Sequence, residues 1–246
     1  MMAHYRIILL AGIGSLLLLA SCGSPQEIGG TEVAADTLQA TPRETEILSI
    51  GGRSFSIPSP VQAALAIRKS GSKYQKDLTT PLEEVDQATG KMTQAALLGI
   101  YSADLAYVTV HSDGQRAMAT FQAIEKLGTG LELSNAFDRK LMDQFKTNLN
   151  NEDSLLRFSS KAFRAADKYL KTNQREDVST WILTGGWIQS LHLSLADSAG
   201  LKDQKLIDRI GDQKASLDAL IELLTNTDSD RSADPLINVM RELRNE

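Results

Sequence analysis

The sequence predicts an all-α protein: a multi-helix antiparallel bundle of about eight or nine helices around two apolar central helices, with a short N-terminal β-hairpin. Signals that start and end helices recur from residue 59 onward. Two long segments are almost free of charge, and a Gly-Gly pair separates two short runs of alternating residues near the start of the domain. Together these observations predict one helical domain over residues 47–246.

The hairpin is predicted over residues 47–57, which read ILSIGGRSFSI. Apolar and polar residues alternate on both sides of Gly51-Gly52. A two-residue Gly-Gly loop favours a tight hairpin turn, because both turn positions need positive φ.

Helix signals follow in order along the chain. Ser59 precedes a proline and stands three residues before Gln62, and Thr80 precedes a proline and stands three residues before Glu83. Both patterns indicate a helix N-terminus with its capping residue. The apolar spacing then predicts helices over 60–70, 81–89, 92–111, 114–127, 136–149, 151–173, 176–199 and 203–226, with a short one at 235–244.

Caps and apolar stripes support several of these helices. Asp113 and Asn150 are expected to cap the helices that follow them. In the last helix, an apolar stripe is expected to face the core; it consists of Leu236, Val239, Met240 and Leu243.

Two segments depart from the amphipathic pattern. Residues 93–111 carry one charge, Asp104, and residues 178–196 carry none. A helix that is apolar nearly all round is typical of a buried position. Gly99 and the pair Gly185-Gly186 cost helix stability, and close approach of two helix backbones would offset that cost. We therefore expect these two helices at the centre of the bundle.

The N-terminus has the pattern of an export signal. One basic residue, Arg6, precedes an uncharged run over residues 7–20, which is too short to span a bilayer. Small residues and the single cysteine of the chain, Cys22, follow. This pattern predicts a signal peptide over residues 1–21.

Leu19-Ala20-Ser21-Cys22 resembles the lipobox of bacterial lipoproteins. The resemblance implies that Cys22 carries lipid, palmitate included, and becomes the first residue of the mature chain. The alternative is an ordinary secretory signal followed by an unrelated cysteine. Residues 22–46 hold few large apolar residues and are expected to form a flexible tether.

The resemblance also implies a location. Gly rather than Asp follows the cysteine, which favours the outer membrane, and we expect the protein to face the periplasm. The layout, with the phrases IPSPVQAA and ILTGGWIQSL, is similar to uncharacterised all-helical lipoproteins of Gram-negative envelopes. That similarity assigns no activity and no functional residue.

Composition excludes several functions. The net charge of −5 argues against nucleic-acid binding, which needs a cationic surface, and cleavage before Cys22 would remove one more basic residue. A lipidated Cys22 leaves no thiol for catalysis. The three histidines form no recognised metal motif, so we expect no metal, no cofactor and no catalytic residue.

One group of residues could form a ligand pocket between the two central helices. Asp104 shares a helix face with two tyrosines and a histidine, and the second helix offers polar and aromatic partners. The candidates are Tyr101, Asp104, Tyr107, His111, Trp187, Gln189 and His192. The alternative is that Asp104 is a satisfied buried carboxylate that fixes the helix register.

These observations lead to two functional hypotheses. The first is a lipid-anchored envelope protein that acts as a protein-interaction or scaffold module, with other envelope proteins as partners. The second is a small-ligand-binding lipoprotein that uses an inter-helix pocket near Asp104 and Trp187.

Overall fold

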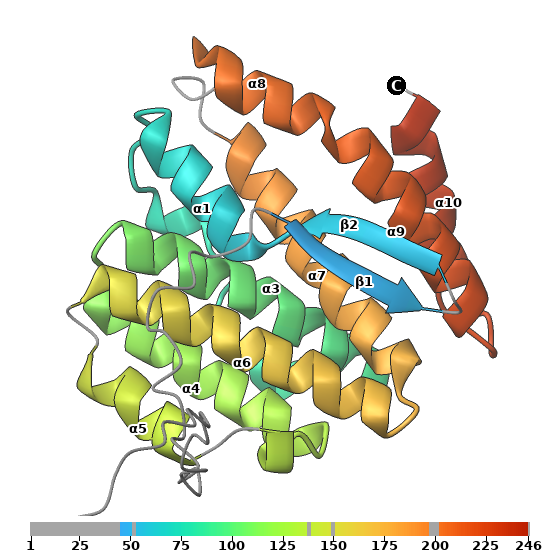
Figure 1. Ribbon diagram of the computed structural model, residues 1–246, viewed down its shortest axis with the longest axis horizontal. Coiled ribbons are helices and arrows are strands. Elements are labelled where there is room, and N and C mark those ends of the chain that lie inside the picture. The colour runs from blue at the N-terminus through green and yellow to red at the C-terminus, as the bar shows by residue number, and fades with distance from the viewer. Residues whose placement is uncertain (1–44, 51–52, 137–138, 149–150, 197–201, 246) are drawn as a thin grey trace, which may run out of the picture. The chain divides into compact units, whose positions relative to one another are not determined.

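The computed structural model describes residues 45–50, 53–136, 139–148, 151–196 and 202–245, and all of them belong to one compact unit (Figure 1). The predicted signal peptide, Cys22 and most of the predicted tether lie outside the described residues. The last two tether positions, Thr45 and Glu46, are part of the first strand.

The all-α prediction is confirmed. The helices are α1 (Pro60–Lys69), α2 (Glu84–Gln87), α3 (Lys91–Val110), α4 (Gly114–Gly130), α5 (Arg139–Thr147), α6 (Glu152–Thr172), α7 (Glu176–Leu195), α8 (Gln204–Gly211), α9 (Gln213–Thr227) and α10 (Asp234–Asn245). Short 3-10 helices cover Lys76–Leu78 and Ser134–Ala136. The predicted hairpin is also present: β1 (Thr45–Ile50) pairs antiparallel with β2 (Arg53–Pro58), and Ile50 lies opposite Arg53.

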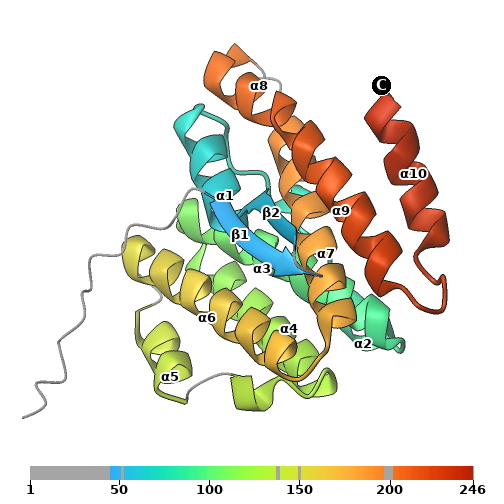
Figure 2. The same ribbon diagram turned by 45° about the vertical axis from the view of Figure 1, so that its right-hand side comes forward.

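The two charge-poor helices, α3 and α7, pack against each other at the centre of the unit (Figures 1 and 2). A Cβ at Gly99 would overlap the carbonyl oxygen of Ile182 and lie 2.7 Å from the Gly186 nitrogen. A Cβ at Gly185 would overlap the carbonyl group of Ala96. The absence of these side chains therefore permits the close backbone contact predicted for the central pair.

The other helices surround this pair. The long helices α4 and α6 lie against α3, while α9 lies against α7 and α10 packs on α9 (Figures 1 and 2). The helix α1 contacts both central helices at one end. The apolar core consequently continues on both sides of the central pair, with Leu98 and Leu127 in one part and Leu183 and Leu220 in another.

Several predicted helix caps are confirmed. The side chain of Ser59 accepts from the amide of Gln62 at 3.3 Å, and Asp113 accepts from the amide of Arg116 at 2.9 Å. The cap of α6 is Asn151, because its side chain accepts the amide of Ser154, rather than the predicted Asn150.

The predicted helix over 81–89 is wrong in extent, because only the four residues Glu84–Gln87 are helical. The amide of Thr80, the expected cap, donates to Asp104, and the carbonyl group of Thr80 accepts from Arg116. Tertiary hydrogen bonds thus replace the expected capping box.

The predicted helix over 203–226 is two helices, α8 and α9, which meet at Asp212. The Gln213 side chain donates to the Arg209 carbonyl oxygen at 2.8 Å and accepts from Trp187 at 2.9 Å. These bonds satisfy a carbonyl group at the end of α8 and connect the junction to α7.

The predicted stripe of α10 is partly wrong. Ile237 and Met240 are buried against α9, whereas Val239 is 60% exposed and Leu243 is 48% exposed. The buried face is therefore rotated from the predicted one, and two of its expected members face outward.

Candidate functional site

Asp104 lies at the centre of a buried hydrogen-bond network. Its side chain, with the residue 1% exposed, accepts from the Thr80 amide at 2.8 Å and from the Gln189 side chain at 2.7 Å. Burial raises the pKa of Asp104, and the hydrogen bonds from Thr80 and Gln189 oppose that rise. The same Gln189 nitrogen also donates to the carbonyl oxygen of Leu78 at 3.0 Å. The carboxylate therefore joins α3, α7 and the segment between α1 and α2.

The two predicted tyrosines hold the same segment. The Tyr101 hydroxyl donates to the Pro81 carbonyl oxygen at 2.7 Å, and the Tyr107 hydroxyl accepts from the Gln75 amide at 3.0 Å. Both rings are almost fully buried. Burial, with the nearby charge of Asp104, raises the pKa of Tyr101 to about 12. These side chains therefore satisfy backbone groups of a segment that has little regular structure of its own.

Arg116 completes the network, although the sequence analysis did not select it. Its guanidinium donates to the Thr80 carbonyl oxygen at 2.7 Å and to the Thr79 hydroxyl at 3.1 Å. Asp113, three residues earlier, accepts from the Tyr74 hydroxyl at 2.7 Å. No sequence signal distinguishes Arg116 from an exposed arginine on an amphipathic helix, since its partners on Thr79 and Thr80 are more than 30 residues away.

The two candidate histidines, His111 and His192, differ in their surroundings. The ring of His111 is stacked on Tyr74 at a centroid distance of 5.4 Å and meets Tyr107 edge-on at 4.7 Å. His192 is exposed on α7. His111 thus belongs to the edge of the buried network, whereas His192 does not belong to it.

The space of the possible ligand pocket around Asp104 is therefore filled. Asp104, Gln189, Tyr101 and Tyr107 lie close together as predicted, but the segment 73–81 of the same chain occupies the space in front of them. The structure thus has the geometry of the alternative for Asp104, a hydrogen-bonded carboxylate that fixes neighbouring elements.

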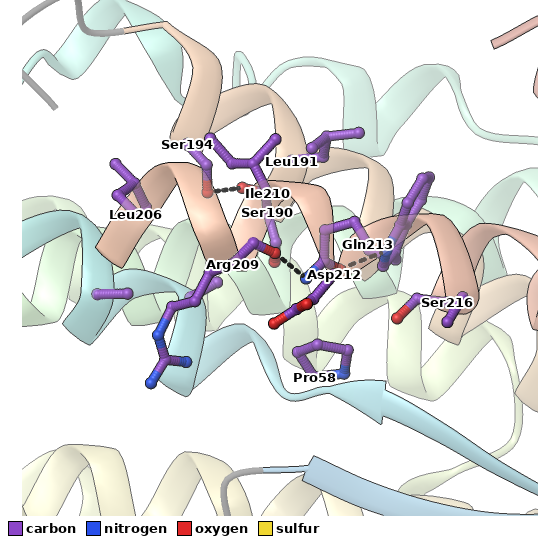
Figure 3. Close-up of a pocket in the computed structure, with 14 residues that line it drawn as sticks. Pro58, Ser190, Leu191, Ser194, Leu206, Arg209, Ile210, Asp212, Gln213 and Ser216 are labelled. Carbon is purple, nitrogen blue, oxygen red and sulfur yellow. Dashed lines mark hydrogen bonds between the residues drawn. The ribbon is translucent and has the colours of Figure 1, made fainter. Parts of the chain in front are cut away.

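Trp187, the remaining candidate, lines a separate cavity of about 430 Å³ (Figure 3). Elements α1, α7, α8 and α9 form this cavity with the end of β2. Its walls are mostly apolar or small, and the lining residues are Pro58, Ala63, Ala66, Trp187, Ser190, Leu191, Ser194, Leu206, Arg209, Ile210, Asp212, Gln213, Ala215 and Ser216.

The polar groups of this cavity differ in how far they are satisfied. The Trp187 indole donates to Gln213, and the Ser194 hydroxyl donates to the Ser190 carbonyl oxygen (Figure 3). The Ser190 hydroxyl donates to the Gly186 carbonyl oxygen, also four residues earlier on α7. Ser216 also lines the cavity, and this residue is only 3% exposed. A cavity with apolar walls and a few polar groups is typical of a small-molecule site, and its volume falls within the usual range of roughly 300–1,000 Å³.

No group of histidine, cysteine, aspartate and glutamate side chains among the described residues could hold a metal ion. No helix within the described ranges is long and apolar enough to cross a membrane. No family model, curated protein or solved structure matches the chain.

Proposed function

We propose that this protein is a lipid-anchored lipoprotein of a bacterial cell envelope that binds a small apolar or amphiphilic ligand in the cavity beside Trp187. The anchor rests on the sequence around Cys22, whose resemblance to a lipobox supports a location at the outer membrane, facing the periplasm. The ligand-binding role rests on one observation, the cavity of about 430 Å³ between α1, α7 and the α8–α9 junction.

The cavity supports binding better than the Asp104 network does. The polar groups of Asp104, Tyr101 and Gln189 already have partners within the chain, so an incoming ligand would have to displace them. Beside Trp187, in contrast, apolar walls and the Ser216 hydroxyl face a space that the described residues leave open. Burial of apolar ligand surface against these walls would supply the driving force, at roughly 25 cal/mol per Å².

A fluorescence titration tests the proposal. The chain has two tryptophans, so Trp181→Phe leaves Trp187 as the only indole. We expect the neutral apolar dye N-phenylnaphthylamine to bind this full-length variant saturably, with energy transfer from Trp187. No saturable binding would contradict the proposal.

Paired variants locate the bound dye. Ala66→Leu adds bulk to the cavity wall on α1, while Ala119→Leu adds the same bulk to a half-buried position of α4 that does not line the cavity. We expect Ala66→Leu to reduce dye affinity at least about tenfold, which corresponds to a loss of about 1.4 kcal/mol in binding free energy. Ala119→Leu should leave the affinity unchanged. Ala63→Leu repeats the test from the same helix, and circular dichroism establishes that each variant is folded. Equal effects of the Ala66 and Ala119 variants would argue against this cavity.

A scaffold role is the second candidate, and the outer face of α10 favours it. Val239 and Leu243 are one helical turn apart and about half exposed or more. Exposed apolar pairs of this kind are used in protein contacts. If envelope proteins bind there, Val239→Asp should abolish their cross-linking to the lipidated protein, while Asn238→Asp on the same helix should leave it intact.

A further inference from the structure

We infer that the ligand of the cavity beside Trp187 is an amphiphile with one apolar chain and a zwitterionic headgroup, held at the α8–α9 edge by Arg209 and Asp212. This inference rests on the proposed ligand-binding function and specifies its ligand class.

The rim carries one charge of each sign. Arg209 lies in the last turn of α8 and Asp212 lies between α8 and α9, and both line the cavity at the same edge (Figure 3). Both residues are exposed, and neither side chain has an ion-pair or hydrogen-bond partner among the residues that the structure describes. The two groups also form no ion pair with each other, so both remain available to a ligand.

Both charges are exposed to solvent, and solvation stabilises them there without a partner. Arg209 also lies in the last turn of α8, where the helix dipole favours a cation. The rim therefore carries a positive and a negative group three positions apart in the sequence. A headgroup with an anion and a cation on neighbouring atoms complements this pair, whereas a purely anionic or cationic headgroup meets one attractive and one repulsive charge.

The walls indicate the other half of the ligand. Trp187, Leu191 and Ile210 offer apolar surface. The lining residues of α1 are alanines, whose small side chains leave space for a ligand. At the roughly 30 Å³ that a water-sized group occupies in a liquid, a cavity of about 430 Å³ has room for a single medium-length chain. A ligand with an apolar chain inside the cavity and a zwitterionic head at the rim therefore fits both the apolar walls and the charged rim.

Displacement of bound N-phenylnaphthylamine from the full chain tests this inference. The competitors are decylphosphocholine, decanoate, decyltrimethylammonium and decanol, which share one alkyl chain and differ in the charge of the head. All are used below the concentrations at which they form micelles. We expect decylphosphocholine to displace the dye at the lowest concentration.

Charge variants give the sharper readout. Arg209→Gln and Asp212→Asn should each weaken decylphosphocholine about twofold to fivefold, which is the range for exposed charge pairs. Binding of decanoate should become weaker in Arg209→Gln and stronger in Asp212→Asn, because decanoate is an anion. Neither variant should change the binding of decanol, which is uncharged. Arg241→Gln, an exposed arginine on α10 that does not line the cavity, controls for the change in net charge.

The outcomes separate this inference from the proposed function. If decanol competes as well as decylphosphocholine, or if Arg209→Gln affects decanol equally, the zwitterionic headgroup is wrong while the cavity still binds apolar chains. If neither the dye nor decanol binds, the proposed function itself fails. Opposite effects of the two variants on decanoate, with both weakening decylphosphocholine, support the inference.

Discussion

Replacing Gly99 with alanine is expected to destabilise the protein, although alanine is the better helix former. Gly99 lies on α3, where α3 crosses α7. An added Cβ would overlap the carbonyl oxygen of Ile182 and lie 2.7 Å from the nitrogen of Gly186. Both neighbours are backbone atoms of a helix, so no side-chain rotation can relieve the overlap, and the two helices must separate.

The expected magnitude follows from two opposing contributions. Alanine in a helix interior is favoured over glycine by about 1 kcal/mol. Overpacking a core costs typically about 1–3 kcal/mol, and rigid backbone neighbours place this site at the upper end. The net loss is therefore about 2 kcal/mol, which corresponds to a fall in melting temperature of about 4–8 °C for a domain of this size.

Urea denaturation followed by tryptophan fluorescence measures this loss, since Trp181 and Trp187 both lie on α7. Gly211→Ala is the matched control, because a Cβ at the end of α8 would meet nothing within 4 Å. We expect that control to leave stability unchanged or to raise it by up to about 1 kcal/mol. If Gly99→Ala is as stable as the wild type, the close α3–α7 contact is not as tight as described.

Three further predictions concern polar groups. Asp104→Leu leaves the Thr80 amide and the Gln189 side chain without their acceptor, so urea denaturation should show a loss of about 2–4 kcal/mol, and a loss below about 1 kcal/mol would contradict the network. Burial raises the pKa of Asp104, so the protonated carboxyl group stabilises the folded state. This contribution to stability is fully present below the unfolded-state pKa of about 3.9 and is lost as the pH rises through the folded-state pKa. The wild type should therefore lose stability relative to Asp104→Asn as the pH is raised from about 4, and parallel profiles would refute this sign. Asp203→Ala removes the cap that accepts the Leu206 amide at 2.9 Å; thermal unfolding should show a loss of about 1 kcal/mol, whereas an unchanged melting temperature would mean that the cap contributes nothing.

Local signals predicted much of the fold. The caps at Ser59 and Asp113 act within three residues of sequence, and the structure has both of them. The central position of α3 and α7 was also predictable, because a helix with almost no charge must be buried. In contrast, Thr80 carries an equally good capping pattern and forms no such cap, because Asp104 and Arg116 bind its backbone from distant helices.

The candidate site could be predicted only in part. The spacing on α3 correctly grouped Tyr101, Asp104 and Tyr107, and Gln189 on α7 does contact Asp104. The spacing could not reveal that the segment 73–81 fills the space in front of them. It also placed Trp187 with this group, although its indole points to Gln213 at the α8–α9 junction.

The sequence by itself determined the all-helical class and the central pair, because each depends on residue type and on spacing within one segment. The lipidation of Cys22 stays a prediction from the same kind of local pattern. Only the tertiary structure decided which polar groups were already satisfied and where a cavity remained. Those properties depend on contacts between residues such as Asp104 and Thr80, or Trp187 and Gln213, that are 24 and 26 positions apart. The periodicity of a single helix holds no information about them.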